Sequence, residues 1–427
     1  MKYYIITHGC QMNKSDSERV ATVLREIGYR PALKESEADL VVVVACSVRQ
    51  AAVDRIYGKA RALAKLKITN PYFVSVLTGC VLPRDKRKLA EKFDYVFSID
   101  KISDLKSEIL NLKSNENDYF KIKASHSNDF SAFVPIMTGC NNFCSYCAVP
   151  YVRGREESRG VKDILREIKG LAKTGYSEVI LLGQNVNTYN PKDVKSFSKN
   201  NPYKDYFAAL LWEINQIKGI ERIFFTAPHP KDMSDEVISA LALPKMLNYL
   251  HLPVQSGDDE ILKKMNRNYT ASDYLKLVKK IKKIRPNISL GTDIIVGFPG
   301  ETKKQFQNTV ELYKKADFDI SYHAMYSPRV GTVAAKMKDN VSRQEKKRRW
   351  NVLQKLMEKN TFKKNQIYLG NIVSVLVDGY EKGCYVGNSR EMKRVRFKGD
   401  GVIGKMFNIK IEKAHTWILE GEIAYDK

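Results

Sequence analysis

The sequence predicts an α/β protein with three parts: a doubly wound parallel sheet, a partial (β/α)6 barrel and a small β-barrel at the C-terminal end. Apolar strand patterns alternate with amphipathic helical patterns from the amino terminus, and a second such alternation begins near residue 131. Five short strand patterns follow one another after residue 371. The 427 residues are enough for two or three domains, and 43% of them are hydrophobic, which is enough for their cores.

Residues 1–112 are predicted to form the doubly wound domain. A capping-box pattern at Ser15–Glu18 predicts the start of a helix, and four consecutive valines mark a buried strand. Residues 113–130 are polar and rich in turn formers, which predicts a linker with a short strand at Tyr119–Ile122. The predicted strands of the domain itself are Tyr3–Thr7, Asp39–Ala45 and Tyr72–Leu77.

Residues 131–365 are predicted to form the partial barrel, because only about six strands can be counted and a full barrel needs eight. The chemistry of such barrels lies at the carboxyl ends of the strands. A basic helix is predicted at Arg343–Lys364, with its charges in solvent. The predicted strands are Phe133–Met137, Glu178–Leu182, Arg222–Thr226, Tyr249–Val254, Ser289–Val296 and Ile320–Tyr326.

Residues 366–427 are predicted to form the small β-barrel, in which basic side chains gather on one segment. Arg390, Lys393, Arg394 and Arg396 are the candidates for contacts with RNA phosphates, and a solvated basic edge strand is the alternative. The formal net charge of +24 favours a polyanionic partner, most simply nucleic acid. A basic surface without a partner would have the same composition.

Cys140, Cys144 and Cys147 form a CxxxCxxC loop directly after the first predicted barrel strand. Thiolates bind iron–sulfur clusters and zinc, but structural zinc sites use four protein ligands and no fourth Cys or His is near in the sequence. A four-iron cluster on three cysteines leaves one iron open to an outside ligand. Three buried cysteines without a metal are the alternative.

A second set of cysteines follows the strands of the first domain. Cys10, Cys46 and Cys80 each come after one predicted strand, and parallel strands bring their carboxyl ends to one edge of the sheet. We therefore predict a second three-cysteine cluster site, with three unrelated buried thiols as the alternative. Cys384 lies far from both sets in the sequence and is taken as structural.

Polar residues collect where the predicted barrel strands end. Their joint placement predicts a binding pocket, since amides and carboxylates can bind an amino acid or a ribose and glycines allow close backbone approach. No catalytic role is assigned to His229, His251 or His323. The candidate cofactor-binding residues are Gly183, Gln184, Asn185, Gln255, Ser256, Asp293 and Glu301.

These motifs together resemble the methylthiotransferase family of radical S-adenosylmethionine (SAM) enzymes. The resemblance rests on Thr7–Asn13, Ala45–Arg49, Gly79-Cys80 and Cys140–Arg159, and the small barrel looks like a TRAM RNA-binding domain. It implies that Cys140, Cys144 and Cys147 bind a [4Fe–4S] cluster that chelates SAM, and that Cys10, Cys46 and Cys80 bind a second [4Fe–4S] cluster. Val44-Ala45 and Val81-Leu82-Pro83 depart from the family pattern; neither departure removes a ligand, and both are expected to alter the pocket of the second cluster.

Within this family, Leu182–Asn187, His251–Gly257 and Met265–Arg267 resemble the branch that converts isopentenyl-adenosine at position 37 of tRNA to its 2-methylthio form. The family mechanism uses one SAM to methylate a cluster sulfide and a second to generate a 5′-deoxyadenosyl radical that activates carbon 2 of the adenine. The alternatives are methylthiolation of threonylcarbamoyl-adenosine in tRNA or of a ribosomal protein. A non-catalytic RNA-binding iron–sulfur protein is the alternative of another class.

The expected partners follow from the same resemblance. They are the anticodon stem-loop of tRNA, a flavodoxin or ferredoxin-type electron donor, and a sulfur or iron–sulfur carrier. Seven cysteines in so long a chain do not indicate a disulfide framework, and no run of about 18 apolar residues is present. We therefore expect a cytoplasmic protein without a membrane segment, acting as a monomer.

Overall fold

The computed structural model describes residues 1–46, 50–110 and 119–425. Residues 47–49 of the second cysteine motif and residues 113–118 of the predicted linker therefore lie outside the described residues. Within the described ranges, no helix combines the length and apolar character needed to cross a membrane. The α/β fold class is confirmed, whereas the domain boundaries stay predictions.

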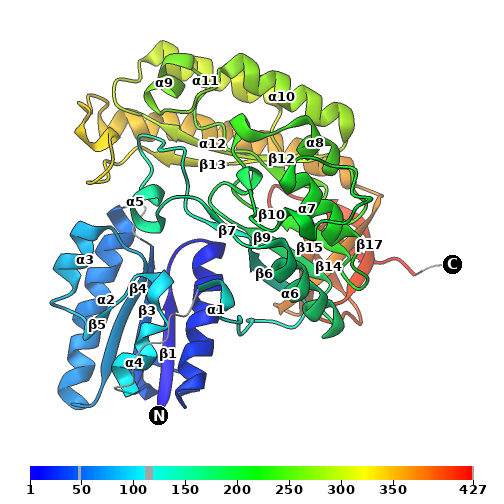
Figure 1. Ribbon diagram of the computed structural model, residues 1–427. Coiled ribbons are helices and arrows are strands. Elements are labelled where there is room, and N and C mark those ends of the chain that lie inside the picture. The colour runs from blue at the N-terminus through cyan, green and yellow to red at the C-terminus, as the bar shows by residue number, and fades with distance from the viewer. Residues whose placement is uncertain (47–49, 111–118, 426–427) are drawn as a thin grey trace.

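The amino-terminal sheet is parallel throughout and carries helices on both faces (Figure 1). Val42 and Val44 pack with helix α1 (Gln11–Glu26), whereas Val41 and Val43 pack with α2 (Gln50–Thr69) on the other face. The predicted doubly wound sheet is thereby confirmed. Its strand order is β2 (Arg30–Pro31), β1 (Lys2–Thr7), β3 (Leu40–Cys46), β4 (Val74–Cys80) and β5 (Tyr95–Val96).

Two local predictions in this region are wrong. Helix α1 begins at Gln11, so the segment Ser15–Glu18 lies inside the helix, where Asp16 is fully buried, and does not form a capping box. The predicted strand at Tyr119–Ile122 is instead a short 3-10 helix, η3 (Tyr119–Lys121). The two segments contact each other in the interior, where the hydroxyl of Tyr119 donates to Asp16 Oδ1 at 2.6 Å.

The central part contains the six barrel strands in chain order, in two three-stranded parallel sheets. An isolated parallel bridge between Ile223 and Met246 links the end of one sheet to the segment before the other. One hydrophobic core joins both sheets to the surrounding helices, among them α6 (Val161–Lys173) and α10 (Ala271–Ile284). The strands are β6 (Ser131–Pro135), β9 (Glu178–Leu182), β10 (Arg222–Phe225), β11 (Tyr249–His251), β12 (Ser289–Val296) and β13 (Ile320–Met325).

Helix α12 (Arg343–Asn365) packs along β13 and is less exposed than its charge suggests (Figure 1). Lys346 and Arg349 are buried and form ion pairs with Asp339 and Glu301. The prediction that the charges of this helix are solvated is therefore wrong for these two residues. Helical periodicity cannot reveal this, because the partners come from other segments.

The C-terminal strands close into the predicted small barrel. The barrel is attached to the central part by polar contacts: the Arg222 guanidinium donates to the Ser389 carbonyl at 3.3 Å, and the Asn248 amide donates to the Arg390 carbonyl at 2.7 Å. Its strands are β14 (Ile372–Glu381), β15 (Cys384–Ser389), β16 (Arg394–Lys398), β18 (Leu419–Ile423) and β17 (Met406–Ala414), in the order in which they pair.

Candidate active site

The CxxxCxxC loop lies between β7 (Met137–Thr138) and the short helix α5 (Val149–Arg153). The Cys140 amide donates to the Gly154 carbonyl at 3.2 Å, and the Cys147 amide donates to the Cys144 carbonyl at 2.9 Å. Gly139 has φ of +76°, and a Cβ there would lie 1.9 Å from the Arg155 carbonyl oxygen. The loop therefore folds back tightly on itself and keeps its three thiols in one short segment.

Arg267 is a charged residue that contacts one of the loop's thiols. Its Nη1 donates to Cys144 Sγ at 3.5 Å, while Nη2 donates to the Pro253 carbonyl at 2.8 Å and Nε to the Tyr269 hydroxyl at 2.9 Å. The side chain is held by fixed partners on three sides. Sequence reasoning quoted Arg267 only as part of a family motif and gave it no role, although its position in that motif was an available signal.

The second cysteine set comes together as the topology predicts. Cys46 and Cys80 are register partners at the ends of β3 and β4, and a Cβ on Gly9 would lie 2.8 Å from Cys46 Cβ. The side-chain oxygen of Asn13 lies 3.6 Å from Cys10 Sγ and 3.7 Å from Cys80 Sγ. The buried Asn13 amide thus lies between Cys10 and Cys80 at the carboxyl edge of the sheet, with Cys46 beside Cys80 in the strand register.

The thiols of the two cysteine sets suit iron–sulfur clusters better than single metal ions. Among the described residues, no three His, Cys, Asp or Glu side chains converge as ligands of one ion. In a four-iron cluster each thiolate binds a different iron, so spaced thiols fit that group. Burial raises the pKa of Cys80 to about 11 and that of Cys147 to about 12. Binding of iron by these thiols would therefore displace protons.

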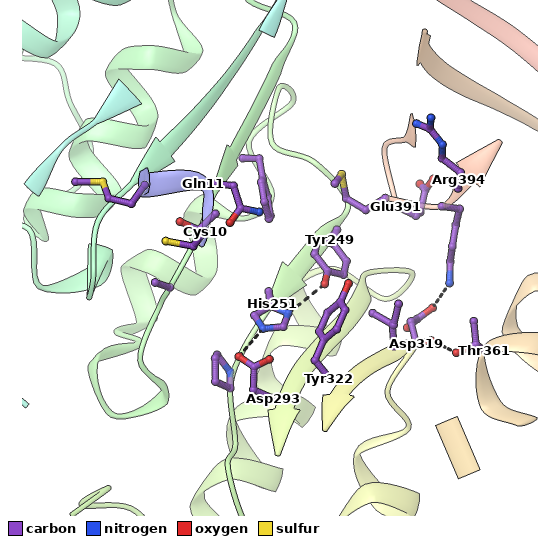
Figure 2. Close-up of a pocket in the computed structure, with 18 of the residues that line it drawn as sticks. Cys10, Gln11, Tyr249, His251, Asp293, Asp319, Tyr322, Thr361, Glu391 and Arg394 are labelled. Atoms are coloured by element: carbon purple, nitrogen blue, oxygen red, sulfur yellow. Dashed lines mark hydrogen bonds and ion pairs between the residues drawn. The ribbon is translucent and has the colours of Figure 1, made fainter. Parts of the chain in front are cut away.

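A cavity of about 640 Å³ lies between the three parts of the molecule (Figure 2). Figure 2 shows Cys10 and Gln11 on one side, Arg394 and Glu391 on the opposite side, and the tyrosines of β11 and β13 between them. The volume lies within the range of small-molecule and cofactor sites. Its lining residues include Cys10, Val149, Gly183, Gln184, Phe224, Tyr249, His251, Asp293, Tyr322, Lys393, Arg394 and Trp417.

His251 stands in the cavity wall with both ring nitrogens engaged. Its Nε2 lies 3.0 Å from Asp293 Oδ2, and its Nδ1 lies 3.2 Å from the Tyr249 hydroxyl. The Tyr322 ring lies beside it, with the ring centroids 5.7 Å apart. Sequence reasoning assigned His251 no role, and its place at the end of a predicted barrel strand was the signal that could have drawn attention to it.

The predicted cofactor-binding residues divide into two groups. Gly183, Gln184 and Asp293 line the cavity, and Asn185 follows directly. The side-chain oxygens of Gln184 and Asn185 are buried without a hydrogen-bond partner in the described part of the chain, and Gln184 is the one of the two that lines the cavity. Elsewhere, the Gln255 amide pairs with the Asp293 carbonyl in β12, Ser256 is buried against Thr309, and Glu301 pairs with Arg349.

The predicted RNA-binding residues all have partners within the chain. Lys393 and Arg394 line the cavity, where Lys393 pairs with Asp319 at 3.0 Å and Arg394 with Asp378 at 2.6 Å. Arg396 pairs with Glu420, and Arg390 donates to the Met246 carbonyl at 2.9 Å. Trp417 also lines the cavity, and sequence reasoning missed it. Its side chain is half exposed.

Comparison with known families and folds places the chain in a class. Residues 134–313 match the radical SAM superfamily, and residues 2–99 match the uncharacterized protein family UPF0004. The fold resembles the radical SAM methyltransferase TsrM from Kitasatospora setae, with a TM-score of 0.55, 13% identity, and coverage of 78% of this chain and 76% of that one. Together with the cysteine loop, these matches define a radical SAM protein.

Curated relatives narrow the class. A tRNA-2-methylthio-N6-dimethylallyladenosine synthase of Clostridium botulinum is 41% identical and covers 99% of this chain and 96% of its own length. Proteins of the same name from Caldicellulosiruptor saccharolyticus and Carboxydothermus hydrogenoformans are 43% and 41% identical, with 99% and 98% of this chain and 92% and 98% of their own lengths covered. The chain belongs to the tRNA-2-methylthio-N6-dimethylallyladenosine synthase family.

Proposed function

We propose that the chain is a tRNA methylthiotransferase that adds a methylthio group to carbon 2 of isopentenyl-adenosine. The observation that carries this proposal is one cavity that is lined by Cys10 of the second cysteine set and by Val149, which follows the first set. The amide of Val149 donates to Cys147 Sγ at 3.5 Å, so the first set lies next to the cavity lining. A protein that only binds RNA has no need for two thiol sets beside one cavity.

The cofactors proposed are SAM and two [4Fe–4S] clusters. Cys140, Cys144 and Cys147 would hold the cluster that binds SAM. The unpaired oxygen of Gln184 in the cavity lining would accept from a SAM ammonium or ribose, and that of Asn185 directly beside it is the second candidate. Cys10, Cys46 and Cys80 would hold the second cluster. When bound, these groups supply the radical chemistry that activates carbon 2 and the sulfur that is transferred.

The chain itself supplies a binding site for a base that has left the RNA stack. Phe224, Tyr249 and Tyr322 line the cavity, and aromatic side chains stack on flipped bases. Asp293 and Tyr249 hold the His251 ring between them, and these two contacts fix the orientation of the imidazole in the cavity wall. A base stacked on these rings would shield the cavity from water, which protects reactive intermediates from side reactions.

The partners proposed are the tRNA anticodon stem-loop, a flavodoxin or ferredoxin-type electron donor, and a sulfur or iron–sulfur carrier, with the enzyme acting as a cytoplasmic monomer. Arg390, Lys393, Arg394 and Arg396 remain the candidates for phosphate contacts. Arg394 supports this best, because its side chain is about one-third exposed at the cavity and exposed ion pairs are weak enough for a phosphate to compete.

The test uses anaerobically reconstituted protein with SAM, a reductant and an isopentenylated tRNA anticodon stem-loop, with nucleosides read by mass spectrometry. We expect the 2-methylthio product from the parent chain. Replacement of Cys10, Cys46 and Cys80 by alanine should leave SAM cleavage and abolish the product. Replacement of Cys140, Cys144 and Cys147 should abolish both. Cleavage of SAM by the parent without the methylthio product would contradict the proposed substrate.

A further inference from the structure

Arg153 is a buried cation in direct contact with the second cysteine set. Its Nε donates to Cys80 Sγ at 3.1 Å, and only 2% of its side chain is exposed. Its Nη2 donates to Asp16 Oδ2 at 2.5 Å, and Nη1 lies 3.4 Å from Oδ1 of the same carboxylate. One planar guanidinium thus holds a sulfur and a carboxylate at the same time.

The partners of Arg153 come from the elements that carry the second cysteine set. Asp16 lies on α1, the helix that follows Cys10, and Cys80 ends β4. The carboxylate of Asp16 is fully buried and also accepts from the Tyr119 hydroxyl. The buried pair therefore orients the guanidinium rigidly, because neither charge can turn toward solvent.

Arg153 itself belongs to the segment that carries the first cysteine set. It ends α5, the helix that follows the CxxxCxxC loop, and α5 packs against β4 (Figure 1). The next carbonyl, that of Gly154, accepts from the Cys140 amide. A single residue therefore connects the loop of Cys140 to the sulfur of Cys80, across the junction between the two cysteine sets.

We propose that Arg153 is a positioning residue that fixes the second cluster relative to the first and donates a hydrogen bond to its Cys80 ligand. The inference rests on the proposed function, since it assumes that the second set binds a cluster. Hydrogen bonds to the sulfurs help to set the reduction potential of a cluster, and groups that hold the ligands in place affect metal affinity roughly 10- to 100-fold. Lysine cannot replace this contact, because it lacks the planar fork.

The experiment uses the full chain with Cys140, Cys144 and Cys147 replaced by alanine, so that only the second set can bind a cluster. In this background, Arg153→Lys is compared with Tyr119→Phe, which removes a bond to Asp16 from the same network but touches no sulfur. A further variant, Arg153→Gln with Asp16→Asn, removes both buried charges together and leaves none unpaired. Iron content, the rate of iron loss to a chelator, the reduction potential and the thermal unfolding midpoint are measured.

Both Arg153 variants should lose iron about tenfold faster than the background chain and show a more negative potential. The direction follows because the lost hydrogen bond stabilises the more negative, reduced cluster. Tyr119→Phe should leave both quantities unchanged. The inference about Arg153 would be overturned by an unchanged reduction potential in the Arg153 variants or by the same shift in Tyr119→Phe. Iron loss that only follows a lower unfolding midpoint would overturn it too. None of these outcomes contradicts the proposed function. A background chain without iron would overturn the second cluster of the proposed function, and the role of Arg153 with it.

Discussion

Glu301 Oε2 accepts a hydrogen bond from Arg349 Nη1 at 2.6 Å, and both side chains are buried. The same carboxylate oxygen accepts from the Gly297 amide at 2.7 Å. The pair joins helix α12 to the loop after β12. Glu301 was a candidate cofactor contact by sequence, and its geometry indicates that it also stabilises the barrel.

Glu301→Gln should destabilise the chain by about 3 kcal/mol, because it removes the buried counter-ion of Arg349 and leaves this cation only its pairing with the more exposed Glu345. The affinity for SAM should change much less than the stability. Denaturant unfolding and equilibrium binding of SAM to the reconstituted protein measure the two effects. A large loss of SAM affinity at unchanged stability would show instead that Glu301 acts chiefly on the cofactor.

Arg267→Lys should lower SAM cleavage at least tenfold, because the guanidinium contacts Cys144 Sγ, the Pro253 carbonyl and the Tyr269 hydroxyl at once and an ammonium cannot. Formation of 5′-deoxyadenosine under reducing conditions is the measurement. Tyr269→Phe is the matched control, since it removes one partner of Arg267 but leaves the contact with the sulfur. Equal activity of Arg267→Lys and the parent would sink this idea.

Trp417→Ala should weaken binding of the stem-loop about tenfold, because a half-exposed indole at the cavity can stack on a base and such stacking contributes about 1–3 kcal/mol. Trp417→Phe should recover most of the affinity. Tyr380 is equally exposed and does not line the cavity, so Tyr380→Ala serves as the control. Equal losses in the two alanine variants would argue against stacking at Trp417.

His323 should make folding sensitive to acid. Burial lowers its pKa from 6.5 to about 4, with its Nε2 2.7 Å from the Ser321 hydroxyl. Between these two pH values the unfolded chain binds a proton that the folded chain does not, so stability falls as the pH falls, by at most about 3 kcal/mol. His323→Gln removes this contribution. The difference in unfolding midpoint between parent and variant should therefore be smaller at pH 5 than at pH 8. An equal difference at the two pH values would contradict the prediction.

Sequence reasoning located the elements that depend on short-range pattern. Strands β9 and β12 have the bounds that were predicted. The convergence of Cys10, Cys46 and Cys80 followed from topology, because Cys46 and Cys80 end two strands of one parallel sheet and Cys10 follows a third. Spacing along the chain carries this information, so no knowledge of distant contacts was needed.

The roles of the charged residues could not be obtained in this way. Arg153, Arg267 and Arg349 belong to segments that are basic or polar in sequence, and nothing local shows that all three guanidinium groups are buried against a sulfur or a carboxylate. The error at Ser15–Glu18 has the same origin, since Asp16 is buried by Arg153 and Tyr119.

The sequence alone determined the three-part α/β architecture, the two cysteine sets and the family, because periodicity and motif spacing are properties of contiguous residues. Only the tertiary structure decided that Arg153 connects the two sets, that His251 is held between Asp293 and Tyr249, and that Trp417 lies at the same cavity as Cys10. Whether a polar side chain is solvated or buried against a partner depends on segments far away in the chain, and that information appears only when those segments pack together.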